Sequence, residues 1–110
     1  MASDVVVENL RPGSMSKLGL GHKDMRALKP ELVWAIISGF GRMDGFRGPY
    51  SDRPAFDIVA QGMSGIINVV GFADKPPSWT IYGMADIYSG LTTAFGITQA
   101  LFMRERTGQG

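Results

Sequence analysis

The carboxylate of Asp86 is the only charged group between Pro76 and Met103, and it follows Gly83 at the start of a long apolar segment. A carboxylate beside the first turn of a helix either caps free backbone amides or is available as a reactant, because it is ionised at neutral pH and can attack an activated carbonyl. The amides and dipole of that helix end would hold it ionised and help to stabilise an oxyanion. From the spacing of these residues alone, a helix cap is the favoured interpretation of Asp86.

Few other residues offer chemistry. The absence of cysteine excludes thiol catalysis, thiolate metal sites and disulfides, and a single histidine, His22, excludes a histidine-rich metal centre. Eleven Lys and Arg balance ten Asp and Glu to a net charge of +1 without a basic run, so nucleic acid is not expected as a partner. The first residues, Met1 to Asp4, lack the features of a secretory signal, and a cytoplasmic location is expected.

Two uncharged segments, Ile58 to Ala73 and Ile87 to Met103, approach the length of about 17 residues that a membrane span requires. Both contain glycine and polar residues at a density that favours helices buried in protein. The sequence therefore predicts no membrane association.

The first third of the chain has the pattern of a parallel strand pair. The runs Asp4–Glu8 and Leu32–Ser38 are predicted strands, and short helices are expected between them, the clearer one from Lys23 to Leu28. A strand, helix, strand order implies a right-handed crossover and a parallel sheet. Such sheets bind ligands at the carboxyl ends of their strands, here the glycine-containing turns at 9–13 and 38–41.

Two long helices are expected to follow. One begins near Pro54 and carries an apolar stripe through Val70, and the other runs from the region of Asp86 to Gly108 with apolar residues on two sides. The intervening segment 42–53 is predicted as a surface loop, in preference to a substrate lid. The predicted fold class is α/β, a partial Rossmann-like parallel sheet (βαβ unit) followed by two long buried helices, with residues 1–110 forming one partial domain.

Six strings in order and spacing closely resemble the class III CoA-transferases, which include formyl-CoA transferase, carnitine CoA-transferases and α-methylacyl-CoA racemase. They are Val5–Gly13, Leu18–Gly21, Ile37–Gly41, Phe56–Gly65, Ala85–Gly90 and Arg104–Gly110. Members of that family are several times longer, and two of their chains interlock as a homodimer. The resemblance implies that this chain is an internal fragment of the family's large domain.

The resemblance also implies a mechanism, in which Asp86 is the catalytic aspartate. Its carboxylate would attack the thioester of an acyl-CoA to form a mixed anhydride, and the released CoA would then form an aspartyl-CoA thioester with which a carboxylic acid reacts. Coenzyme A and acyl-CoA are thus substrates, and neither a permanently bound cofactor nor a metal is expected.

Five further residues match substrate-binding positions of the family. Asn9 and Leu10 match positions that contact CoA, Lys17 matches a basic position near the nucleotide phosphates, and Phe56 and Asp57 match positions that line the active site. For Lys17 the alternative is a solvated surface residue, and for Asp57 it is a favourable charge in the first turn of a helix.

One departure from the family narrows the activity. The racemase branch has histidine where this chain has Phe56, and His22 lies in the wrong segment to replace it, so racemisation is disfavoured. Two hypotheses remain: the chain is part of a CoA-transferase that needs the remainder of the enzyme, or it is an inactive truncated relative that associates with copies of itself through apolar helices.

Overall fold

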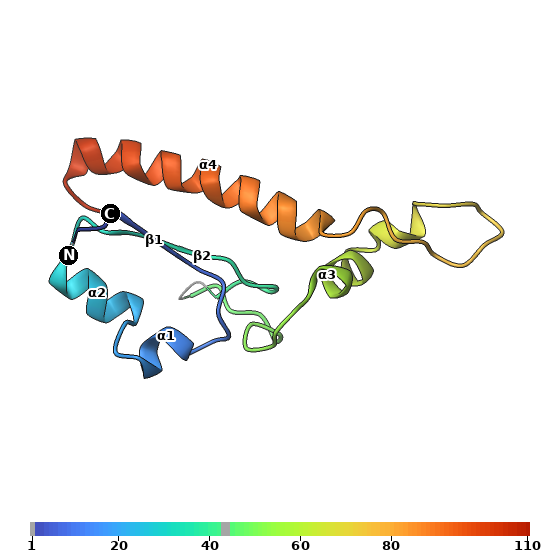
Figure 1. The fold of residues 1–110 in the computed structure, drawn as a ribbon, viewed down its shortest axis with the longest axis horizontal. Coiled ribbons are helices and arrows are strands. Elements are labelled where there is room, and N and C mark those ends of the chain that lie inside the picture. Colours follow the sequence, from blue (N-terminus) through green and yellow to red (C-terminus); the bar gives the residue numbers. More distant parts are fainter. Residues whose placement is uncertain (1, 43–44) are drawn as a thin grey trace.

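A two-stranded parallel sheet lies between one long helix and two short ones in the computed structural model, which describes residues 2–42 and 45–110 (Figure 1). Its elements in chain order are β1 (Val5–Glu8), α1 (Ser14–Lys17), α2 (His22–Leu28), β2 (Val33–Ile36), α3 (Asp57–Ser64), the 3-10 helix η1 (Ile66–Asn68) and α4 (Met84–Thr107). The α/β class and the helical crossover between two parallel strands are confirmed.

The two strands pair in parallel, with Val5 opposite Val33 and Glu8 opposite Ile36. Ile37 extends the ladder by donating its N–H to the carbonyl of Glu8 at 2.9 Å. The second strand is shorter than the predicted range, because β1 ends at Glu8 and residues after Ile37 have no partner strand. Both strands therefore end at the same edge of the sheet, where the turns at 9–13 and 38–41 meet.

The predicted length of the first long helix is wrong, since α3 covers only Asp57–Ser64. Gly65 follows it with φ 78°, a left-handed conformation that ends an α-helix and that glycine adopts without steric cost. The apolar stripe continues beyond this point only as the single turn of η1. The described part of segment 42–53 contains no helix or strand, as expected for a loop, and residues 43 and 44 lie outside the described residues.

The second long helix forms as expected, but it is not buried. Helix α4 has 24 residues, ends at Gly108 and carries Arg104 and Arg106 in its last turn, where cations interact favourably with the helix dipole. None of its residues is buried, and Leu91 and Phe95 are 64% and 68% exposed. Helix α4 packs against β2 and, near its start, against α3, and its outer face is left uncovered, so the prediction of burial on two sides is wrong for this structure.

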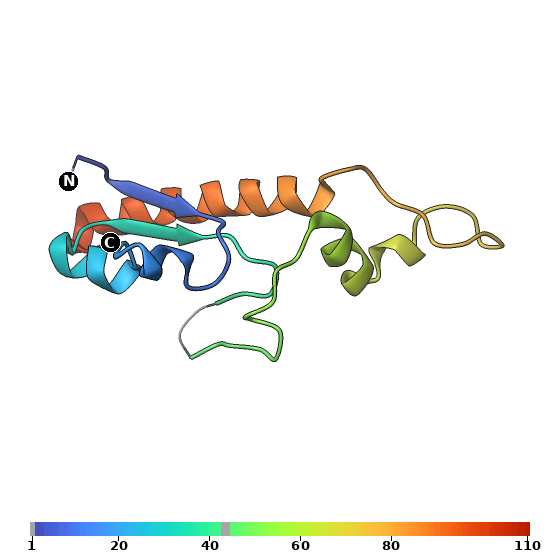
Figure 2. The same ribbon diagram turned by 60° about the horizontal axis from the view of Figure 1, so that its bottom comes forward.

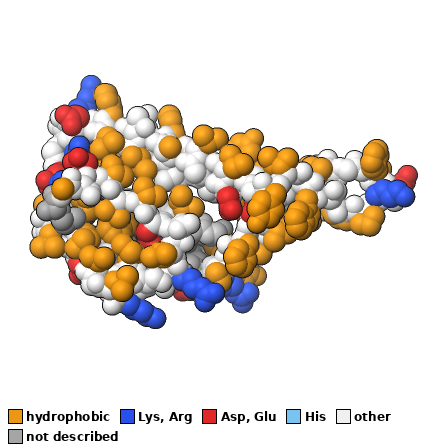
Figure 3. All heavy atoms as spheres, in the orientation of Figure 1, with side chains coloured by type: hydrophobic (Ala, Val, Ile, Leu, Met, Phe, Trp, Pro, Cys, Tyr) orange, Lys and Arg blue, Asp and Glu red, His pale blue; other side chains and the backbone are white. Residues whose placement is uncertain are grey.

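The chain is more extended than a compact domain of its size. Its radius of gyration is 16.9 Å, against about 13 Å for a compact chain of this length. The accessible surface is 8168 Å², roughly 2,200 Å² more than a monomer of this mass exposes. Figures 1 and 2 show α3, η1 and the following loop projecting away from the sheet, and Figure 3 shows apolar side chains along this arm and over α4.

Within the described ranges, no helix combines the length and the apolar character needed to cross a bilayer.

Candidate active site

A pocket of about 200 Å³ lies where both strands end. The turns after β1 and β2 form one side, and the first residues of α3 and α4 form the other. This is the edge at which a parallel sheet was expected to place its ligand. Two of its lining residues, Gly39 and Ala55, are in tight contact, because a Cβ atom on Gly39 would lie 2.2 Å from the Cβ of Ala55.

Five of the six residues predicted for the site line this pocket: Asn9, Leu10, Phe56, Asp57 and Asp86. They come from segments almost 80 residues apart in the sequence, so the fold, and not sequence proximity, gathers them. The sixth, Lys17, lies in the last turn of α1, is exposed and does not line the pocket. The roles assigned to all six remain predictions.

Asp86 is the third residue of α4, exposed at the pocket, and its carboxylate makes no hydrogen bond or ion pair with any described residue. The cap position belongs to Gly83, which has φ 78° and no side chain to offer. The alternative that Asp86 is the helix cap is therefore wrong. Its carboxylate is left available to a ligand.

Asp57 holds the start of α4 from a different helix. Its Oδ1 accepts a hydrogen bond from the N–H of Ala85 at 2.6 Å, and its Oδ2 accepts those of Gly83 at 3.0 Å and of the Gln61 amide at 2.6 Å. Burial opposes ionisation of this half-buried carboxyl, but the hydrogen bonds from Ala85, Gln61, Gly83 and the Asp86 N–H outweigh it and hold the pKa of Asp57 below its ordinary value. Asp57 also occupies the first turn of α3, as its alternative reading predicted.

The amides at the start of α4 are consequently occupied. Gly83 and Ala85 donate to Asp57, and the N–H of Met84 faces the carbonyl of Ile81 at 3.4 Å. The expectation that these amides stabilise an oxyanion is not supported by this arrangement, because the donors are already used. Oxyanion stabilisation has to come from other groups.

Gln61 is a residue that sequence analysis missed. It is 2% exposed, donates to the carbonyl of Ile81 at 3.0 Å and accepts from the hydroxyl of Thr80 at 3.0 Å. The available signal was its spacing, since a polar residue four positions after Asp57 lies on the same helix face as that carboxylate.

Two arginines add positive charge to the pocket. Arg11 and Arg53 both line it, and the guanidinium of Arg53 lies 4.9 Å from the ring centroid of Tyr50. A guanidinium in this position can bind a carboxylate or a phosphate through two parallel hydrogen bonds. Cations and the unpaired carboxylate of Asp86 thus share one small cavity.

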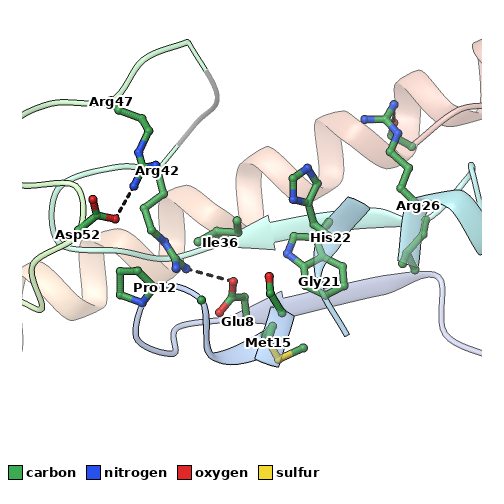
Figure 4. Close-up of a pocket in the computed structure, with 15 residues that line it drawn as sticks. Glu8, Pro12, Met15, Gly21, His22, Arg26, Ile36, Arg42, Arg47 and Asp52 are labelled. Atoms are coloured by element: carbon green, nitrogen blue, oxygen red, sulfur yellow. Dashed lines mark hydrogen bonds and ion pairs between the residues drawn. The ribbon is translucent and has the colours of Figure 1, made fainter. Parts of the chain in front are cut away.

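A second cavity, of about 820 Å³, lies between the sheet and the short helices α1 and α2 (Figure 4). Glu8 and Arg42 form a buried ion pair there at 3.0 Å, with 8% and 10% of their side chains exposed. None of the predicted site residues lines it. It is larger than the pocket at the strand ends, but the two side-chain carboxylates that line it, Glu8 and Asp52, are paired with Arg42 and Arg47.

Comparison with known proteins supports the pattern read from the sequence. Residues 1–110 match the model of the CoA-transferase family III. The chain is 41% identical over 110 residues to the acetyl-CoA:oxalate CoA-transferase of Acetobacter aceti, covering 98% of this chain and 27% of that protein. It is 36% identical over 108 residues to the succinyl-CoA:mesaconate CoA-transferase of Haloarcula hispanica, with 98% and 27% covered.

Solved structures agree. A CAIB/BAIF family protein from Brucella suis superposes with a TM-score of 0.90 at 40% identity, covering 98% of this chain and 28% of that one. The Rv3272 protein from Mycobacterium tuberculosis follows with a TM-score of 0.84 at 34% identity, covering 97% and 29%. The chain spans about a quarter of the length of the curated relatives it matches.

Proposed function

Because the chain belongs to the CoA-transferase family III, we propose that it carries the nucleophile and part of the substrate site of an enzyme that moves CoA from an acyl-CoA to a carboxylic acid. The observation that supports this most is the exposed, unpaired carboxylate of Asp86 in a pocket shared with Asn9 and Leu10. A carboxylate without internal partners is free to act as a nucleophile.

The proposed reaction has four acyl transfers. An Asp86 oxygen attacks the thioester carbon of the donor, and the C–S bond breaks to give a mixed anhydride and CoA thiolate. The thiolate attacks the aspartyl carbonyl, releasing the donor's carboxylate and leaving an aspartyl-CoA thioester. The acceptor carboxylate displaces the thiolate to form a second anhydride, and the thiolate attacks the acceptor's acyl carbon and regenerates Asp86. No net proton or electron is required.

In this proposal, several other pocket residues bind and orient the substrates. Asn9 and Leu10, on the turn after β1, contact CoA, while Phe56 supplies an apolar wall. Arg11 and Arg53 attract the acceptor's carboxylate toward the nucleophile. Lys17 is left as a contact for the CoA phosphates outside the pocket, where an exposed lysine acts as a point charge.

We further propose that these residues work as part of a longer polypeptide that forms a homodimer. The support is the coverage of about a quarter of the relatives' length and the uncovered apolar side chains of α4, such as Leu91 and Phe95. Sequencing the DNA on both sides of the reading frame tests the first part. Family-like sequence beyond the 110 residues is expected, and unrelated sequence on both sides would contradict it.

A covalent adduct on Asp86 is the direct test of the function. The protein, expressed from its natural reading frame, is incubated with an isotopically labelled acyl-CoA, and its peptides are analysed by mass spectrometry. We expect an acyl or CoA adduct on the peptide containing Asp86, and none in Asp86→Ala. An adduct that persists unchanged in Asp86→Ala would overturn the proposal.

The second candidate is an inactive module that associates with copies of itself. The excess of exposed surface and the apolar side chains on α4 favour it. Analytical ultracentrifugation of Leu91→Lys and Phe95→Lys tests this function. Dissociation of a dimer by these changes, in a protein that forms no adduct, would favour the module over the enzyme.

A further inference from the structure

Two side chains on α3 form hydrogen bonds with the backbone that immediately precedes the proposed nucleophile in the sequence. Asp57 and Gln61, named here the clamp, are one helical turn apart and are joined by a hydrogen bond of 2.6 Å. Together they form five hydrogen bonds with residues 80–85, to Thr80 twice and to Ile81, Gly83 and Ala85. The segment that leads into α4 is thereby fixed to α3.

The clamp has little freedom to do anything else. Gln61 is 2% exposed, and both its carbonyl oxygen and its amide nitrogen are bonded. Both oxygens of Asp57 accept hydrogen bonds from groups of the protein. A buried polar group with all its partners is costly to disturb, because a partner left unpaired keeps its desolvation penalty.

Other contacts at this end of α4 are sparse. The cap residue, Gly83, has no side chain, and its neighbour Tyr82 is 86% exposed. Earlier in the same arm, Phe72 and Trp79 are 80% and 55% exposed. The side chain of Asp86 has no partner of its own among the described residues, so the orientation of its carboxylate depends on the backbone that the clamp holds.

We propose that Asp57 and Gln61 are positioning residues, which set the direction of attack of Asp86 through the backbone of Gly83 and Ala85. This inference rests on the proposed function and revises the expected role of Asp57, from a residue that binds substrate to one that acts through another residue. Misplacing a reacting group by about 1 Å is sufficient to slow a reaction about 100-fold.

Three variants separate positioning from substrate binding. Asp57→Asn keeps the size of the side chain but replaces one acceptor oxygen with a donor that faces an N–H group. Asp57→Glu keeps two acceptors on a longer side chain, and Gln61→Met keeps the length and removes both hydrogen-bonding groups. Each is made in the protein expressed from its natural reading frame and checked for cooperative thermal unfolding.

The decisive readouts are the single-turnover rate of adduct formation on Asp86 and the dissociation constant of CoA. We expect Asp57→Asn to lower the rate about 100-fold with CoA affinity unchanged, Asp57→Glu to recover most of the rate, and Gln61→Met to fall between them. Loss of CoA affinity in parallel with the rate, or an unchanged rate in a folded Asp57→Asn, would overturn the inference. If Asp57→Asn does not fold, Gln61→Met decides by the same criteria.

Different results would contradict the role of the clamp and the proposed function. If the unaltered protein forms no adduct, the proposed function fails, and the clamp is then tested by hydrogen exchange at the amides of Gly83 and Ala85. Faster exchange at both amides in Asp57→Asn supports the clamp. Exchange that stays as slow as in the unaltered protein contradicts it.

Discussion

The two ends of α4 are held by different kinds of interaction. At its start, the half-buried carboxylate of Asp57 and the buried amide of Gln61 bond to the backbone. At its end, Arg104 pairs with Asp4 at 3.1 Å, and the Asp4 side chain is 63% exposed. Hydrogen bonds shielded from water fix a geometry, whereas exposed ion pairs contribute little and weaken with salt. The end that carries Asp86 is the end with the shielded network.

Replacement of Asp86 is the change with the largest expected effect, because it removes the reacting group. We expect Asp86→Asn to abolish CoA transfer in a coupled assay while leaving thermal unfolding unchanged, since this side chain has no partner among the described residues. Asp74→Ala, in the exposed loop before α4, is the matched control and retains activity. Full activity in Asp86→Asn would contradict the assignment.

Gly39 offers a second way to damage the pocket end of the molecule. A Cβ atom there would lie 2.2 Å from the Cβ and 3.3 Å from the Cα of Ala55, so Gly39→Ala forces the two walls apart. We expect a loss of about 1–3 kcal/mol in the free energy of unfolding, together with weaker CoA binding. Urea unfolding and calorimetry measure the two effects.

A matched glycine on α4 provides the control for this change. A Cβ on Gly96 meets nothing within 4 Å, so Gly96→Ala is expected to stabilise the helix by roughly 1 kcal/mol. Equal effects of the two alanines on stability would show that the contact between Gly39 and Ala55 does not exist.

Acid should loosen the start of α4. The pKa of Asp57 is held below its ordinary value, so its carboxylate stabilises the folded state above about pH 4. That contribution is lost as the pH falls through the lower, folded-state value. We expect the free energy of unfolding to decline over this acidic range, and less steeply in Asp57→Asn. Identical pH profiles for the two proteins would argue against the clamp.

The smallest effect is expected at the other end of the helix. Hydrogen bonds from Arg104 and Lys29 lower the pKa of Asp4. Its contribution to the free energy of unfolding is therefore also lost as the pH falls, as for Asp57. Because Asp4 is exposed, Asp4→Asn is expected to destabilise only slightly, and the difference should vanish in 1 M salt, where the screening length is about 3 Å. A salt-resistant loss as large as that of Asp57→Asn would remove the contrast between the two ends.

Sequence patterns predicted the parallel pair, and the pocket lies at the edge they indicated, because β-branched runs and the crossover rule are local or topological signals. They overestimated the length of the helix after Pro54. The left-handed conformation of Gly65 ends this helix, and helix propensity alone does not predict it. They also missed Gln61 and the occupied amides of α4. Those features depend on a contact between α3 and residues 80–85, and no single segment of sequence contains it.

The most direct test follows an oxygen atom. The acceptor acid is labelled with oxygen-18 in its carboxyl group. If Asp86 forms mixed anhydrides, a labelled oxygen of the acceptor bridges the two acyl groups of the second anhydride. When CoA thiolate attacks the acceptor's acyl carbon, that bridging oxygen stays on the aspartate. Mass spectrometry of the peptide containing Asp86 is then expected to show oxygen-18 in that side chain after many turnovers. Product formation with an unlabelled Asp86 would contradict the nucleophilic role of this residue.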